Sequence, residues 1–153
     1  MKTTICGLLA AAMLFTTGTA AAQEHWTEGP VWECSAYRTE PGQFDTYMKW
    51  IRAHAEVISQ EAKKQGLIID YKTFVKAPRD QNDYDVLFCT LHSNYGKALD
   101  YNKGDDDKFD AISAAHWATD NEDKQTELNA PRLKMRTFMG TSYHREVTLR
   151  APE

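Results

Sequence analysis

The sequence predicts an α+β fold in which four strands form one antiparallel sheet and helices cover one face of it. Apolar residues follow a helical period in one long segment and a two-residue period in two others. Two further segments are apolar on nearly every residue, as strands buried on both faces are. The predicted order is strand, helix, strand, strand, helix, strand, which is the split βαβ or ferredoxin-like arrangement.

The first half of this pattern is a strand followed by a long helix. Val31–Tyr37 has apolar side chains on both faces, which favours a central strand, and residues 23–30 are expected to be an irregular lead-in. Turn residues at 40–42 end the strand. Residues 43–65 then carry one apolar helical stripe, and Gly66 is a typical stop residue. The stripe consists of Phe44, Met48, Ile51, Ala55, Ile58 and Ala62.

A hairpin is predicted next. Residues 67–76 alternate between apolar and polar side chains, as a half-buried strand does. Residues 84–91 are almost continuously apolar, which again favours a central strand. The polar segment 77–83 between them contains turn residues and fits a hairpin connection.

The last third predicts a second helical region and a final strand. Gly104 divides a short helical piece around Tyr95 from a longer one, which Asp105 or Asp106 could cap. Residues 121–131 are compatible with either helix or loop. A last alternating strand is expected within residues 138–149.

Residues 1–22 have the pattern of an export signal. Lys2 is followed by an apolar run that is too short to span a bilayer, and small residues precede Gln23, where we expect cleavage. Residues 23–153 then form a single periplasmic or secreted domain, without a membrane association once the signal is removed. The formal net charge of −4 argues against nucleic acid as a partner.

Two cysteines, Cys34 and Cys89, remain after cleavage. The predicted fold places them on adjacent antiparallel strands, and an exported location permits a disulfide. Two buried free thiols are the alternative, because the register of the strands does not follow from the sequence. Neither cysteine has the spacing of a metal site, and we predict no metal ligands.

Residues 31–100 resemble the dimeric α+β barrel superfamily, which includes antibiotic-biosynthesis monooxygenases, haem-degrading proteins and NIPSNAP-type proteins. The resemblance rests on the strand Val31–Tyr37, the turn at 41–42, the amphipathic helix, and residues 61–66 leading into the second strand. It implies a homodimer, which would also bury the sheet face that no helix covers. This superfamily supports many unrelated reactions, so the resemblance does not identify a catalytic set.

Two histidines are the candidate catalytic residues. His54 lies on the flank of the first helix beside Trp50, and His116 lies on the apolar face of the second helix beside Trp117. Histidine can transfer protons near neutral pH or ligate haem iron. A satisfied core histidine and a partly exposed helix histidine are the alternatives. Further expected pocket residues are Tyr37, Trp50, Tyr71 and His92.

Two functions are compatible with these observations. The first is an exported small-molecule-binding protein, resembling either cofactor-independent oxygenases or haem-binding proteins. The second is a non-catalytic exported homodimeric module. A sizeable cavity with convergent histidines would favour the first, and a filled interior would favour the second. The sequence identifies neither the cofactor nor whether the protein is an enzyme.

Overall fold

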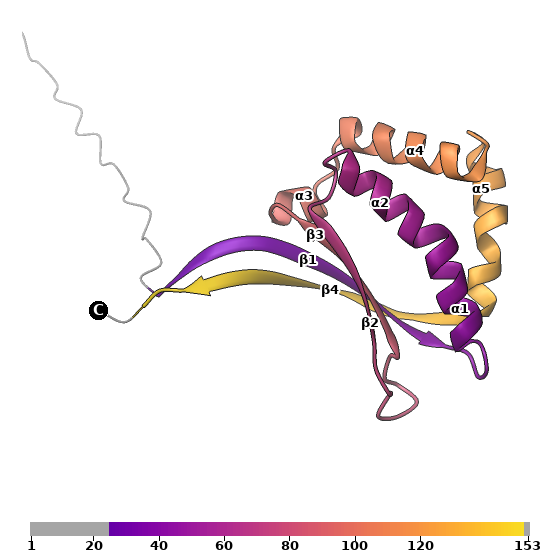
Figure 1. Ribbon diagram of the computed structural model, residues 1–153, viewed down its shortest axis with the longest axis horizontal. Coiled ribbons are helices and arrows are strands. Elements are labelled where there is room, and N and C mark those ends of the chain that lie inside the picture. The colour runs from indigo at the N-terminus through magenta and orange to yellow at the C-terminus, as the bar shows by residue number, and fades with distance from the viewer. Residues whose placement is uncertain (1–24, 152–153) are drawn as a thin grey trace, which may run out of the picture.

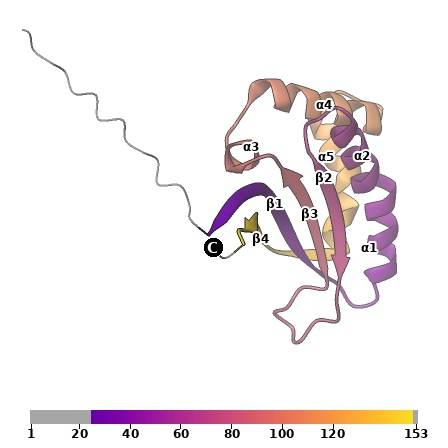
Figure 2. The ribbon, with the colours of Figure 1, turned by 60° about the vertical axis from the view of Figure 1, so that its left-hand side comes forward.

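A computed structural model describes residues 25–151, so the predicted signal segment and its cleavage position lie outside the described residues. The structure is an α+β fold with one four-stranded antiparallel sheet in the order β2-β3-β1-β4. Figures 1 and 2 show the four longer helices gathered on one side of this sheet. The strands are β1 (Trp26–Thr39), β2 (Asp70–Val75), β3 (Val86–His92) and β4 (Arg136–Leu149).

The helices fall into two groups along the chain. The first is one continuous helical rod between β1 and β2, and the second connects β3 to β4. The rod consists of α1 (Phe44–Trp50), a π-helical segment η1 (Ile51–Ala55) and α2 (Glu56–Lys64). The second group consists of α3 (Tyr95–Leu99), α4 (Lys103–Trp117), α5 (Glu122–Asn129) and a short 3₁₀ helix η2 (Ala130–Lys134).

The two strands predicted to be central are central. β1 pairs with β3 on one side and with β4 on the other, and β3 pairs with β1 and β2. Each of the two strands therefore has a paired neighbour along both of its edges. Val31 and Val86 are completely buried.

The prediction of an irregular lead-in before Val31 was wrong. β1 begins at Trp26, because the equally long β4 continues beyond the other strands and offers its backbone as a partner. Gly29 and Pro30 form a bulge in this extension, opposite Glu146. A Cβ atom at Gly29 would lie 3.1 Å from the Glu146 carbonyl oxygen. Proline, which has no N–H to donate, is tolerated at such a bulge.

Two apolar clusters hold the helices on the sheet. Tyr47 and Ile51 of the rod pack against Val86 of β3. Farther along the rod, Ala62 packs with Ile68, in the connection to β2, and with Ile112 of α4. The predicted stripe therefore faces the sheet at one end and α4 at the other.

Asparagines, and not the predicted aspartates, cap the helices of the second group. The Asn102 side chain accepts a hydrogen bond from the Asp105 N–H at 3.1 Å, and Asn94 and Asn121 cap α3 and α5 in the same way. Asp105 and Asp106 lie in the first turn of α4, where negative charge is favourable. Residues 121–131, which were compatible with helix or loop, are mostly helical.

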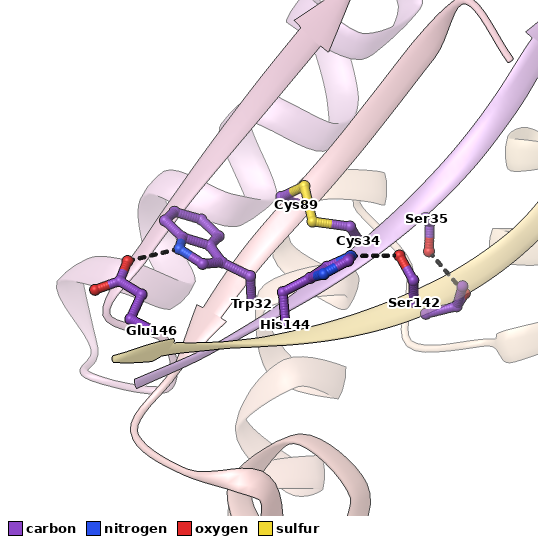
Figure 3. Close-up of a disulfide and its surroundings, with 8 residues drawn as sticks. Trp32, Cys34, Ser35, Cys89, Ser142, His144 and Glu146 are labelled. Atoms are coloured by element: carbon purple, nitrogen blue, oxygen red, sulfur yellow. Dashed lines mark hydrogen bonds between the residues drawn. A yellow bond between two sulfur atoms is a disulfide. The ribbon is translucent and has the colours of Figure 1, made fainter. Parts of the chain in front are cut away.

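Cys34 and Cys89 are directly opposite each other in the β1–β3 ladder and form a disulfide with a Cα–Cα distance of 4.1 Å. Tyr37 faces the helices, so the alternation of β1 turns Cys34 to the other face, which we call the open face. Trp32 lies near the disulfide in Figure 3 and donates its indole N–H to Glu146 at 2.7 Å. The Lys72 ammonium lies 5.0 Å from the Trp32 ring.

The open face carries both apolar and polar groups. Phe74, Leu87, Ala36 and Gly140 form one row across the four strands, and Phe74 is 50% exposed. Ser142 and His144 are hydrogen-bonded to each other on β4 (Figure 3). Within residues 25–151, no helix is long and apolar enough to cross a bilayer.

Candidate functional site

A pocket of about 440 Å³ lies between the sheet and the helices, within the size range of small-molecule sites. Residues of β1 and β3 line one side, and residues of the rod, α4, α5 and η2 line the rest. We call it the sheet–helix pocket. Its lining consists of Glu33, Ser35, Trp50, His54, Ala55, Ile58, Ser59, Ala62, Ile68, Phe88, Thr90, His92, Phe109, Trp117, Asn129 and Arg132.

His54 lies in the π-helical segment of the rod. The Glu56 N–H donates to the Ile51 carbonyl, five residues back, in place of the usual four. The wider turn changes the angular spacing of the side chains that follow Trp50. Single π-helical turns occur frequently at functional sites, because they displace one side chain from its regular position.

The two candidate histidines form a hydrogen bond. His54 Nδ1 and His116 Nε2 are 2.9 Å apart, although the residues come from different helices. Trp117 stacks on the His54 ring with centroids 4.6 Å apart and an angle of 21° between the planes. Trp50 contacts the same ring at 5.1 Å. Two tryptophans and a second imidazole therefore fix the position of His54.

Burial lowers the pKa of His54 below its ordinary value of 6.5, and the neighbouring His116 lowers it further. His54 is therefore neutral at pH 7. The hydrogen bond allows two tautomeric arrangements. With the proton on His54 Nδ1, its Nε2 is an acceptor; with the proton on His116 Nε2, the His54 Nε2 carries a proton and is a donor. The imidazole can thus present either a base or an acid.

The two histidines border different spaces. His54 lines the sheet–helix pocket, whereas His116 lines a separate groove of about 630 Å³ between α2 and α4, which we call the outer groove. Ile58 lines both spaces. The His54–His116 hydrogen bond therefore connects the pocket to the outer surface of the helical layer.

A second polar pair lies on the sheet side of the pocket. His92 Nε2 donates to Glu33 Oε2 at 3.2 Å, and the two residues belong to adjacent strands. Tyr143 of β4 is opposite Glu33, and burial together with that carboxylate raises the pKa of the Tyr143 hydroxyl. Glu33 is therefore held by neighbours from two strands.

The pocket residues predicted from the sequence divide into two groups. Trp50, His54 and His92 line the sheet–helix pocket. Tyr37 lies beyond one end, in contact with Tyr47 and Phe138. Tyr71 packs beside the Ala62 cluster and donates its hydroxyl to Glu56 at 2.7 Å.

Several pocket residues had no sequence signal of their own. Arg132 directly follows residues 121–131, which were compatible with helix or loop, and no motif singles it out. Glu33 is an acidic residue within the strand Val31–Tyr37, and no spacing marks it either. Asn129 precedes the 3₁₀ helix that positions Arg132.

No family model, curated protein or solved structure matches this chain. The described residues also contain no group of three or more histidine, cysteine, aspartate or glutamate side chains arranged to hold a metal ion.

Proposed function

We propose that this protein is an exported small-molecule-binding protein in which His54 and His116 act as an acid–base pair. The observation that carries this proposal is the 440 Å³ pocket whose wall contains the His54 imidazole, hydrogen-bonded to a second imidazole. A structural core would be expected to fill such a space, because protein interiors are close-packed.

The hydrogen bond gives a route for a proton. A proton taken up at His54 Nε2 on the pocket side can be balanced by transfer of the Nδ1 proton to His116 Nε2. His116 can then lose its Nδ1 proton to the outer groove. This arrangement suits a ligand that must be deprotonated, as in cofactor-independent oxygenation of an aromatic substrate.

Haem binding would use the same unprotonated nitrogen of His54, since an acceptor hydrogen-bonded to Nδ1 orients a ligating imidazole. The volume of about 440 Å³ lies towards the lower end of the range of small-molecule sites, which favours a ligand smaller than haem.

The remaining parts of the proposal concern the fold and the location. The strand order β2-β3-β1-β4 and the helices on one face support a ferredoxin-like fold. The open face supports a homodimer of the dimeric α+β barrel kind, because it leaves Phe74 half exposed. The signal-like residues 1–22 and the Cys34–Cys89 disulfide support a periplasmic or secreted location.

A non-catalytic exported homodimeric module is the alternative. It uses the open face in the same way, but gives the pocket and the histidine pair no role. The two proposals differ in what they predict for a ligand and for variants of His54.

Native mass spectrometry of the exported protein, purified from its own host, is the first test. We expect a mature chain that begins at Gln23, a dimeric mass, and an additional small molecule that is lost on denaturation. Tryptophan fluorescence provides the second readout, because Trp50 and Trp117 both line the pocket.

Variants separate the two proposals. His54→Ala and His116→Ala should weaken binding of the co-purified molecule and leave the dimer folded. His144→Ala is the matched control, since His144 lies on the open face. A protein without any bound molecule, whose tryptophan fluorescence responds to no ligand, would contradict the binding proposal and favour the structural module.

A further inference from the structure

Arg132 lies in the wall of the sheet–helix pocket without a carboxylate partner. Its side chain is half-buried, and among residues 25–151 it forms no ion pair with Asp or Glu. With its amide oxygen facing the guanidinium, Asn129 accepts from Arg132 Nη1 at 3.2 Å and from Nη2 at 3.3 Å. A guanidinium has five N–H donors, so Asn129 leaves part of the donor set free.

A second arginine increases the positive charge at this end of the pocket. Arg136 lies 3.4 Å from the Tyr37 ring centroid and 5.0 Å from that of Tyr47, and Arg132 lies 5.6 Å from that of Trp50. Burial, followed by repulsion from Arg136, lowers the pKa of Arg132. The aromatic rings contribute cation–π attraction, but they do not neutralise the two charges.

The missing carboxylate does not reflect a shortage of acids. The chain has 22 acidic residues and 18 Lys and Arg residues. Some cations of the described region do have such partners: Lys63 and Lys97 are paired with aspartates at 2.7 and 2.5 Å. A pair of arginines beside a pocket, in an acidic chain, is therefore a local arrangement suited to an anion.

The rest of the pocket is mainly apolar. On the sheet side it runs along β3 from Phe88 to His92, a distance of about 13 Å at 3.3 Å per residue. Along the direction of the strands, the Glu33–His92 pair lies at one end of the pocket, and Trp50 and Arg132 lie at the other. Between the two ends the lining consists mainly of Ala55, Ile58, Ile68, Phe88, Phe109 and Trp117.

We infer that the ligand of this pocket is an apolar carboxylic acid, bound as its anion with the carboxylate on Arg132 and its apolar body between the tryptophans and Phe88. Arginine suits this role because its planar donors match a carboxylate in a two-pronged hydrogen bond. Asn129 is a positioning residue that fixes the guanidinium plane. The inference rests on the proposed binding function and specifies the class of ligand.

Matched acid and amide probes test the inference. 2-Naphthoate and 4-phenylbutyrate, each compared with its primary amide, have a size close to that of the pocket and differ from their amides mainly in charge. Titration calorimetry on the mature dimer should show each acid binding at least tenfold more tightly than its amide. The affinity of the acids should fall with increasing salt, whereas the affinity of the amides should change little.

Three variants locate the effect. Arg132→Gln should abolish the preference for the acid and leave binding of the amide within about twofold. Arg132→Lys should keep a reduced preference, since it retains the charge but not the planar fork. Arg52→Gln is the matched control, because Arg52 is an exposed arginine of the helical rod that does not line the pocket. Circular dichroism and thermal melting check that each variant is folded.

The outcomes separate the two proposals. Equal binding of acids and amides, or an unchanged preference in Arg132→Gln, would overturn the anion inference and leave the binding function standing. Failure of all four probes to bind the wild-type protein would also overturn the anion inference, and native mass spectrometry of the exported protein then decides the binding function separately.

Discussion

Removal of the Cys34–Cys89 disulfide should cost a large part of the stability of this domain. The appropriate variant is Cys34→Ala/Cys89→Ala, because a single substitution would leave a reactive thiol on the partner strand. Both cysteines are buried, at 5% and 1% exposure, and they lie on adjacent central strands. Alanine fits both positions without introducing a polar group.

The expected loss of stability follows from the length of the chain segment that the disulfide closes into a loop. Cys34 and Cys89 are 55 residues apart in the sequence, for which the chain-entropy model gives about 4 kcal/mol at 25 °C. The void left by two sulfur atoms adds a smaller cost. In a domain of this size, a loss of about 4 kcal/mol should lower the melting temperature by roughly 15 °C. It is also a large part of the roughly 5–15 kcal/mol by which domains are commonly stable.

Urea unfolding of both proteins without reductant measures the difference. The wild type should also have the smaller m-value, because a cross-linked unfolded chain exposes less surface. Wild-type protein unfolded in the presence of reductant is the control, and it should approach the double variant. A loss below about 1 kcal/mol, or two free thiols per mature chain in denatured, unreduced protein, would refute this reasoning.

Three other predictions concern packing, pH and assembly. Ile51→Asp should destabilise the protein by more than about 3 kcal/mol in urea unfolding, since Ile51 is 5% exposed and a charge there has no partner; a smaller effect would show that the cluster around Tyr47 tolerates water. Because the folded-state pKa of His54 is depressed, the unfolded chain binds more protons in acid, and stability should fall as the pH drops below 6.5. The His54→Asn variant should lose much of this fall in stability at acid pH, whereas His144→Asn should retain it. An unchanged pH dependence of stability in His54→Asn would contradict the depressed pKa of His54. Light scattering should give twice the mature mass for the wild type and a monomer for Phe74→Glu on the open face; a wild-type monomer would rule out the dimer.

The arrangement of strands and helices was predictable because it depends on local periodicity. The stripe of the helix at 43–65 and the two-faced strand at 31–37 each follow from one side-chain pattern, and both lie where the patterns placed them, within a few residues. The β1 extension from Trp26 was missed because it exists only through pairing with β4. Pairing partners and register depend on contacts between distant segments.

The candidate site was predictable only in part, for the same reason. His54 and Trp50 could be identified because aromatic residues on a helix flank are unusual for a solvated edge. The π-helical turn that displaces His54 has no sequence signature of its own, since neither glycine nor proline occurs in it. Arg132 and Glu33 become notable only when the fold places their charges beside a cavity.

The β1–β4 extension has a practical consequence for handling the protein. Trp26 pairs with Leu149, so the first and last strand residues lie together at one tip of the sheet. Trp26 is five residue steps, or about 16 Å, from Val31, which is opposite His92 at the near end of the pocket. An affinity tag, a surface tether or a fused reporter at either terminus should therefore leave access to the pocket unobstructed. A short linker joining residues 25 and 151 would permit a circularly permuted chain with new ends in the 77–83 hairpin loop.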